Sequence, residues 1–172
     1  MNLRLQVNHQ TIEVESQPGD SLLKVLRANG YFGVKHGCET GECGACAILL
    51  DGKPVNSCLF PAAEVEGRTV TTVEGLQGPH GKLSAVQKAF VDHGAIQCGF
   101  CTPGMIMSAT ALLSDHPDPT EVQIREALAG NICRCTGYVQ IVVAVRAAAG
   151  AMRRPKISAT ENTECTEGRK QQ

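Results

Sequence analysis

Hydrophobic and polar residues alternate in short stretches over the first 74 residues, which is the spacing of half-buried β-strands. Residues 3–7 and 11–14 alternate in this way, and the polar residues between them predict a hairpin connection. A helix is predicted to begin after Ser21, which suits an N-cap, and to end at Gly30. Further strands are predicted at residues 45–50, 55–60 and 68–73. These elements indicate a compact α+β unit.

Helical spacing replaces the strand pattern after residue 83. Two capping-box patterns predict helix starts at Ser84 and Thr120, because each is followed by a glutamine three residues later. Thr102 before Pro103 predicts another helix start. A fourth stretch, residues 138–152, is apolar on most faces of a helix. The second half is therefore predicted to be an all-α unit of four helices.

A change in composition separates the two halves. Residues 75–82 read G-L-Q-G-P-H-G-K, and this density of glycine and proline predicts a linker. Residues 153–172 are polar and without periodicity, which predicts an extension. The predicted organisation is an α+β domain over 1–74, a linker over 75–82, a helical domain over 83–152 and an extension over 153–172.

Composition and charge exclude several classes of protein. The net charge is −1, and the chain has six aromatic residues and no tryptophan, so a nucleic-acid-binding surface is not expected. No apolar run approaches the length of a membrane span, and no secretory or twin-arginine signal precedes the first predicted strand. A cytoplasmic location is therefore expected. Nine cysteines in such a compartment indicate metal binding rather than disulfides.

The first four cysteines have the spacing of a plant-type 2Fe-2S site. Three of them follow C-x4-C-x2-C, and the fourth comes after a gap of eleven residues: Cys38, Cys43, Cys46 and Cys58. Gly41 and Gly44 suit a loop that curls around a cluster, because glycine adopts conformations closed to other residues. Structural zinc is the alternative, but zinc sites usually combine paired C-x2-C halves or cysteine with histidine.

A second set consists of a C-x2-C pair and a C-x-C pair: Cys98, Cys101, Cys133 and Cys135. Spacing alone leaves both a 2Fe-2S cluster and zinc open here. Each pair comes directly before a predicted helix, whose N-terminal dipole favours an anionic group. The two sets use eight of the nine cysteines, so electron transfer is the leading function. Cys165, in the extension, is predicted to be a bystander thiol.

Three motifs resemble one family of proteins. They are H-G-C-E-T-G-E-C-G-A-C at 36–46, Q-C-G-F-C-T-P-G at 97–104 and G-N-I-C-R-C-T-G-Y at 130–138. In this order they resemble the small iron–sulfur subunit of the molybdenum hydroxylases, of the xanthine dehydrogenase and aldehyde oxidoreductase type. The resemblance implies a plant-ferredoxin-like (β-grasp) domain and a four-helix domain, each with one 2Fe-2S cluster. It also implies a large molybdopterin-binding partner subunit and usually an FAD-binding one.

The resemblance assigns roles to residues by position. The set beginning at Cys38 would hold the cluster nearer FAD, and the set beginning at Cys98 would hold a buried cluster nearer molybdenum. Gln97 and Cys135 would lie beside the pterin of the partner, where an amide can both donate and accept. The chain would then carry electrons from the molybdopterin centre to FAD or another acceptor, with no catalytic residue of its own. Purines, aldehydes, nicotinate and other N-heterocycles remain open as substrates.

Two other classes of protein stay open beside this interpretation. The first is a structural or binding module that holds two zinc ions, which would be colourless where a 2Fe-2S protein is red-brown. The second is the iron–sulfur subunit of a different redox complex, such as succinate dehydrogenase. That subunit would carry C-x2-C-x2-C-x3-C-P runs, and the sequence has none.

Overall fold

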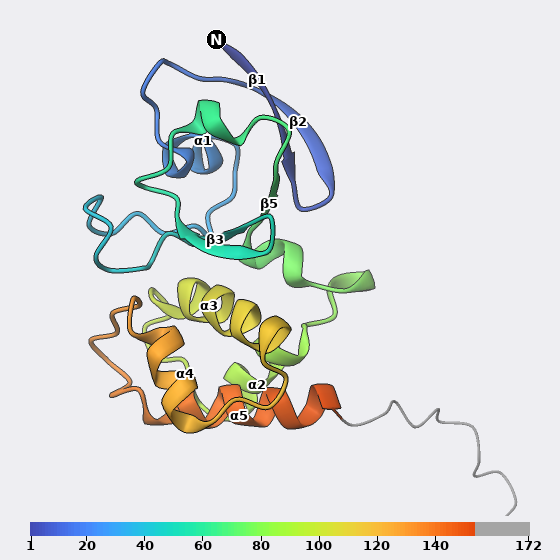
Figure 1. Ribbon diagram of the computed structural model, residues 1–172, viewed down its shortest axis with the longest axis vertical. Helices are drawn as coiled ribbons and strands as arrows, with labels where there is room; N and C mark the ends of the chain where they lie inside the picture. Colours follow the sequence, from blue (N-terminus) through green and yellow to red (C-terminus); the bar gives the residue numbers. More distant parts are fainter. Residues whose placement is uncertain (154–172) are drawn as a thin grey trace, which may run out of the picture.

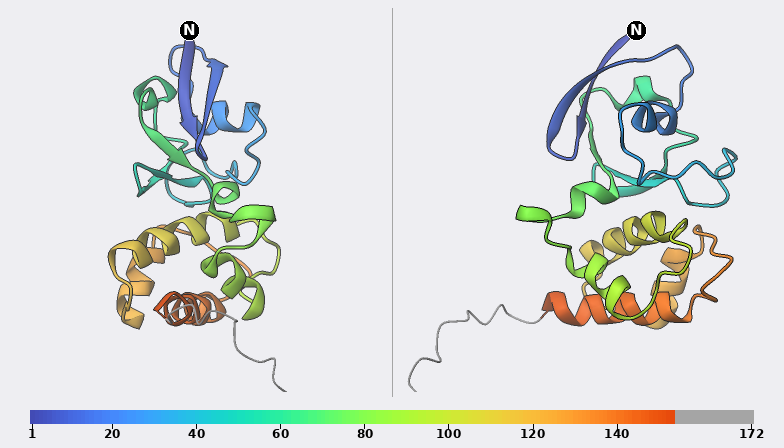
Figure 2. Two further views of the ribbon diagram at one scale, coloured as in Figure 1. Left: turned by 90° about the vertical axis from the view of Figure 1, so that its right-hand side faces the viewer. Right: turned by 180° about the vertical axis from the view of Figure 1, so that it is seen from behind.

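The computed structural model describes residues 1–153 of the chain, so the predicted extension and Cys165 lie outside the described residues apart from Arg153. A sheet-containing unit is stacked on a helical unit, and the segment that joins them runs along one side (Figures 1 and 2). Within residues 1–153 no helix combines the length and the apolar character needed to cross a membrane. The α+β class predicted from the sequence is confirmed.

The first unit contains a mixed sheet of five strands in the order β2-β1-β5-β3-β4. Strands β1 and β2 form an antiparallel hairpin, β1 pairs in parallel with β5, and β3 pairs antiparallel with both β4 and β5. The strands are β1 (Asn2–Val7), β2 (Gln10–Glu15), β3 (Ala47–Leu50), β4 (Lys53–Asn56) and β5 (Thr69–Thr71).

Two-residue turns close both hairpins of the sheet. Asn8 and His9 join β1 to β2 with φ of 50° and 67°, and Asp51 and Gly52 join β3 to β4 with φ of 50° and 82°. Two consecutive positive φ angles are what a type I′ turn requires, and this turn matches the twist of paired strands. The polar residues between the predicted strands therefore mark the hairpins correctly.

Helix α1 (Leu22–Ala28) packs its apolar face against the sheet, and its first turn is capped by the Ser21 hydroxyl, which accepts from the Lys24 amide at 3.3 Å. All four residues of β3 are buried. Ile48 belongs to the core shared with α1, whereas Leu49 packs against the helical unit. Because β3 is covered on both faces, its sequence is a continuous apolar run rather than an alternating one.

The helical unit consists of α2 (Ala85–Asp92), α3 (Thr102–Asp115), α4 (Glu121–Leu128) and α5 (Val139–Arg153) around a shared apolar core. Both predicted capping boxes are present, at Ser84 with Gln87 and at Thr120 with Gln123. Helix α3 lies directly beneath β3 (Figure 1), where Leu49 contacts Met107 and Ala111. This small apolar cluster joins the two units.

Two local predictions are wrong in detail. Strand β4 ends at Asn56, so Cys58 lies in a turn beyond the strand; the Leu59 amide donates to the Asn56 carbonyl there at 3.0 Å. The N-cap position of α3 is Cys101 rather than Thr102. The segment predicted as a linker, residues 75–82, contains part of one 3-10 turn and all of another, η2 (Val73–Leu76) and η3 (Pro79–Gly81).

Candidate metal centres

The loop between α1 and β3 carries three of the first four cysteines. The Cys38 sulfur accepts hydrogen bonds from the backbone amides of Thr40 and Cys43, each at 3.4 Å. A β-carbon on Gly37 would lie 2.8 Å from the Cys43 sulfur, so the loop folds back tightly on itself. Amides that point at sulfur stabilise thiolate charge, which a metal-bound cysteine requires.

The groups that shift the pKa values of these thiols connect Cys58 with the loop cysteines. A hydrogen bond with Thr40, supported by the backbone amides of the loop, lowers the pKa of Cys38 to about 6. Burial raises the pKa of Cys58 to about 11, with further contributions from the Cys46 thiol and from the charge of Cys38. Cys58 therefore joins the loop cysteines although it follows a different strand. Binding of iron would require these thiols to lose their protons.

Two side chains outside the loop hold its shape. The Asn56 amide donates to the Gly41 carbonyl at 2.8 Å, and the buried Ser57 hydroxyl donates to the Cys46 carbonyl at 2.8 Å. Gly41 has a φ of +82° and Gly44 a φ of +65°, in the left-handed region where side chains are strained. The two glycines singled out from the sequence are thus the residues that allow the loop to curl.

The second set lies where α3 and α5 begin. Cys98 and Cys101 precede α3, Cys133 and Cys135 precede α5, and the two helices start at the same end of the unit (Figure 1). The Cys133 sulfur lies 3.0 Å from the Thr136 hydroxyl and accepts from the Thr136 amide at 3.4 Å. The structure therefore brings all four cysteines to the N-terminal ends of two helices, where the dipoles favour negative charge.

The pKa shifts in the second set again connect its members. Burial raises the pKa of Cys101 to about 12, together with a contact to the Cys133 thiol and the charge of Cys98. Burial also opposes ionisation of Cys133, but hydrogen bonds with Thr136 outweigh it and lower that pKa to about 7. A hydrogen bond with Cys98 raises the pKa of Cys135. Each of the four thiols is thus in contact with another member of the set.

The second set is only partly buried within this chain. Cys101 and Cys133 are 8% and 9% exposed, but Cys98 and Cys135 lie on the surface. The predicted burial of the second cluster concerns the assembly with a partner subunit, so it stays a prediction. Gln97, next to Cys98, is also exposed. The two exposed cysteines are in contact with each other, and Gln97 is next to one of them in the chain, as a site that faces another subunit would require.

The donor chemistry of both sets fits a 2Fe-2S cluster. The eight cysteines of the described region are all unpaired thiols, gathered as two groups of four. Among residues 1–153, no three side chains of ligand type converge closely enough to bind a single metal ion. A binuclear cluster does not need such a point, because each of its irons takes two of the four thiolates.

The sequence patterns did not single out Asn56, Asn131 or Tyr138, which position the cysteine loops. The Tyr138 hydroxyl accepts from the Cys133 amide at 2.8 Å and so fixes the loop between two ligand positions. Asn131 and Tyr138 both belong to the motif at 130–138, so their neighbourhood was identified but not their contacts. A half-buried tyrosine and an asparagine in a loop carry no local signal of these partners.

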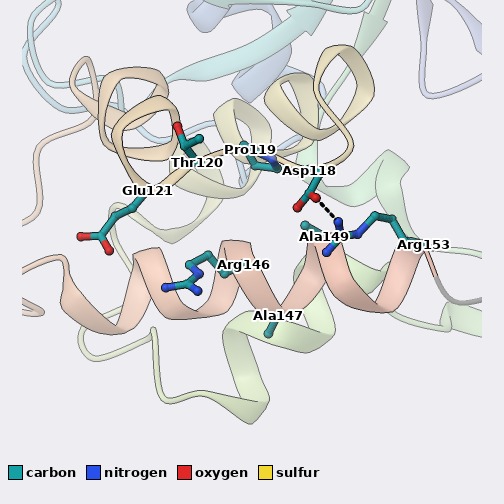
Figure 3. Close-up of a pocket in the computed structure, with 8 residues that line it drawn as sticks. All are labelled: Asp118, Pro119, Thr120, Glu121, Arg146, Ala147, Ala149 and Arg153. Carbon is teal, nitrogen blue, oxygen red and sulfur yellow. Dashed lines mark ion pairs between the residues drawn. The ribbon is translucent and has the colours of Figure 1, made fainter.

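A pocket between two helices is separate from the cysteines. It has a volume of about 460 Å³ and lies between the start of α4 and the second half of α5, lined by Arg146, Glu121 and the ion pair of Arg153 with Asp118 (Figure 3). Its lining contains no thiol. The pocket therefore adds nothing to either cysteine set.

Two family models match the chain in succession. Residues 5–74 match a 2Fe-2S iron–sulfur cluster binding domain, and residues 72–146 match a [2Fe-2S] binding domain. Each matched region contains one of the two groups of four cysteines.

Relatives of known name align over nearly the whole chain. The nicotine 6-hydroxylase small subunit of Paenarthrobacter nicotinovorans is 57% identical, with 87% of this chain and 90% of that protein covered. The xanthine dehydrogenase iron–sulfur-binding subunit of Escherichia coli O157:H7 is 46% identical, covering 83% and 90%. The crystal structure of quinoline 2-oxidoreductase from Pseudomonas putida 86 superposes with a TM-score of 0.85 at 42% identity, covering 91% of this chain and 98% of that one.

Proposed function

The chain belongs to the family of iron–sulfur subunits of molybdenum hydroxylases, and from this we propose how its residues serve electron transfer. It is the electron-transfer subunit of a multi-subunit oxidoreductase and carries two 2Fe-2S clusters. When bound, such a cluster accepts and releases electrons singly. The residues of this chain hold the clusters, shield them and set their potentials.

The observation that carries the proposal is the gathering of eight cysteines into two groups of four, one in each matched region. In the proposed assignment the first cluster is held by the loop of the sheet-containing unit and the second by the starts of α3 and α5. The ligands are Cys38, Cys43, Cys46 and Cys58 for the first cluster, and Cys98, Cys101, Cys133 and Cys135 for the second. Residues 1–74 and 83–152 then act as two cofactor-binding domains.

The exposed face of the second group supports contact with a partner subunit. Phe100, Ile132 and Val139 are 48%, 56% and 59% exposed, and each lies within a few residues of a cysteine of this group. Apolar side chains around a partly open site favour burial against another protein. We assign this face, with Gln97 and Cys135, to the molybdopterin-binding subunit.

The first group is assigned to the acceptor side, where an FAD-binding subunit is proposed. Residues 1–74 carry six basic and nine acidic residues, so this unit has a net negative charge. Such a charge attracts a partner with a positive surface, which suits the transfer of electrons to an acceptor. The substrate is determined by the partner. Xanthine, nicotine and quinoline, the compounds named in the three relatives, are all nitrogen heterocycles, so this class is proposed first.

Metal analysis of the purified full chain tests the proposed ligand sets. We expect about four irons and about four acid-labile sulfides per chain, with no stoichiometric zinc, because each group of four thiolates suits one 2Fe-2S cluster. Plasma emission spectrometry and a sulfide assay give both numbers. About two irons per chain, or one zinc per chain, would show that the second group of cysteines does not hold a 2Fe-2S cluster.

Replacing Gln97 with alanine is expected to slow reduction of the clusters by substrate while leaving their reduction by dithionite close to normal. The reason is that Gln97 is exposed beside Cys98, so its loss disturbs the partner side and not the ligands. Stopped-flow absorbance of the assembled enzyme, with xanthine, nicotine or quinoline as reductant, measures the first rate. Gln6→Ala, at an exposed glutamine of β1, is the matched control. Equal substrate rates for the two variants would contradict the assigned orientation.

A further inference from the structure

A polar contact centred on Asn131 joins the two cysteine-bearing units. The Asn131 side-chain amide donates to the Gly44 carbonyl at 2.9 Å, across 87 residues of sequence. Its side-chain oxygen accepts from the Ser108 hydroxyl of α3 at 2.7 Å. Asn131 is 4% exposed, and both ends of its amide are therefore used in a buried setting. A buried amide with both partners satisfied is a directional contact, unlike the apolar cluster around Leu49.

This contact lies between the two cysteine sets. Gly44 directly follows Cys43, and Ile132 directly precedes Cys133. The Ile132 amide donates to the Cys43 carbonyl at 2.9 Å. A single hydrogen bond therefore links the backbone of Cys43, in the first set, to the backbone of Ile132, the residue before Cys133 in the second set. Any movement of Asn131 relative to Gly44 changes the separation of the two sets directly.

The backbones approach so closely here that only glycine fits. A β-carbon on Gly44 would overlap the Gly130 carbonyl oxygen, and a β-carbon on Gly104 would overlap the Gly44 carbonyl oxygen. Three backbone segments, from the ligand loop, from α3 and from the loop before Cys133, thus meet around the Asn131 side chain. Such close approach leaves little freedom for one unit to shift against the other.

Apolar packing does not fill the neighbouring space. A crevice of about 200 Å³ between the two units is lined by Ala47, Asn56, Ser108 and Asn131, among others. On this side, the hydrogen bonds of Asn131 hold the units together rather than a dense core. Replacing the Asn131 amide with an apolar group would leave the Gly44 carbonyl and the Ser108 hydroxyl without their hydrogen-bond partner. The loss corresponds to a shift of about 5- to 30-fold in the equilibrium between docked and separated units.

We propose that Asn131 is a positioning residue that fixes the distance and orientation between the two clusters, and thereby the rate at which an electron leaves one and enters the other. The exchange oxidises one cluster by one electron and reduces the other by one, so no further reactant is needed. This inference rests on the proposed function, because it requires both groups of cysteines to hold clusters. It assigns a role to a side chain that touches no cluster itself.

The test compares Asn131→Leu with Asn29→Leu in the assembled enzyme reduced by dithionite. Asn29 is the matched control because its amide makes the same kind of bond, to the Val25 carbonyl at 2.9 Å, but within the first unit and outside the ligand loop. Electron paramagnetic resonance measures the magnetic interaction between the reduced clusters, which depends steeply on their separation. Flash reduction measures the rate of exchange between them. Ser108→Ala is a milder second variant, because it removes one partner of Asn131 and leaves the Gly44 contact.

We expect Asn131→Leu to keep its iron and sulfide content. The splitting of its resonance lines by the magnetic interaction between the clusters should narrow or disappear, and electron exchange between the clusters should be slower. Asn29→Leu should keep both the splitting and the rate of exchange. If Asn131→Leu does not assemble, a smaller change of the same sign in Ser108→Ala supports the proposal. An unchanged splitting and rate in fully loaded Asn131→Leu or Ser108→Ala would overturn it. A wild-type enzyme without two clusters would overturn the proposed function and this inference together.

Discussion

Serine in place of Cys43 is expected to remove one cluster and to abolish turnover with the final electron acceptor. Serine offers a harder oxygen donor where iron–sulfur sites select thiolate, so the group of Cys38, Cys46 and Cys58 would lose a ligand. The iron content should fall from about four to about two per chain. The second group lies on separate helices, so its cluster should still be reduced by substrate. Metal analysis and steady-state turnover with an artificial acceptor measure both effects.

The control for this variant is Cys165→Ser. Cys165 lies outside both groups of four and outside the described residues, and it is predicted to bind no metal. We expect wild-type iron content and turnover from Cys165→Ser. Loss of either signal there would show that a ligand is misassigned. Full turnover of Cys43→Ser would show that the first cluster is not on the route to the acceptor.

Alanine in place of Gly104 is expected to destabilise the chain, although alanine normally stabilises a helix relative to glycine. The added methyl group would overlap the Gly44 carbonyl, so α3 and the ligand loop would have to separate. Overpacking of this kind costs about 1 to 3 kcal/mol. The matched control is Gly150→Ala in α5, where a β-carbon meets nothing within 4 Å. That variant should gain about 0.5 to 1 kcal/mol.

Thermal loss of cluster absorbance compares the two alanine variants. For a chain of this size, each kcal/mol corresponds to about 2 to 4 °C in the midpoint. We therefore expect the two variants to shift the midpoint in opposite directions. A Gly104→Ala protein as stable as Gly150→Ala would show that the contact between the two units is looser than the structure has it.

Local signals explain why much of the fold could be predicted. Capping boxes at Ser84 and Thr120 act within four residues, and the hairpin turns at Asn8 and Asp51 need only their own neighbours. The cysteine spacing in the first loop is equally local, because one curled segment supplies three thiols. In each case the residues that form the feature are close together in the chain, so a short sequence pattern is enough to predict it.

Contacts between distant residues explain what the sequence did not reveal. Cys58 lies in a turn because β4 pairs with β3 only as far as Asn56, and pairing length depends on the partner strand. The exposure of Cys98 and Cys135 follows from how α3 and α5 start side by side. The bond from Asn131 to Gly44 spans 87 residues, and neither residue type indicates the other. Such features depend on how two units dock, which no local pattern encodes.

Electron paramagnetic resonance of the enzyme reduced by its own substrate tests the central claim most directly. The claim is that this chain receives electrons from a molybdenum-containing partner in two clusters with different surroundings. Because one cluster is held by a curled loop and the other by two helix starts, the spectrum should contain two distinct signals of equal intensity. A single signal, or signals that appear with dithionite but never with substrate, would contradict the account.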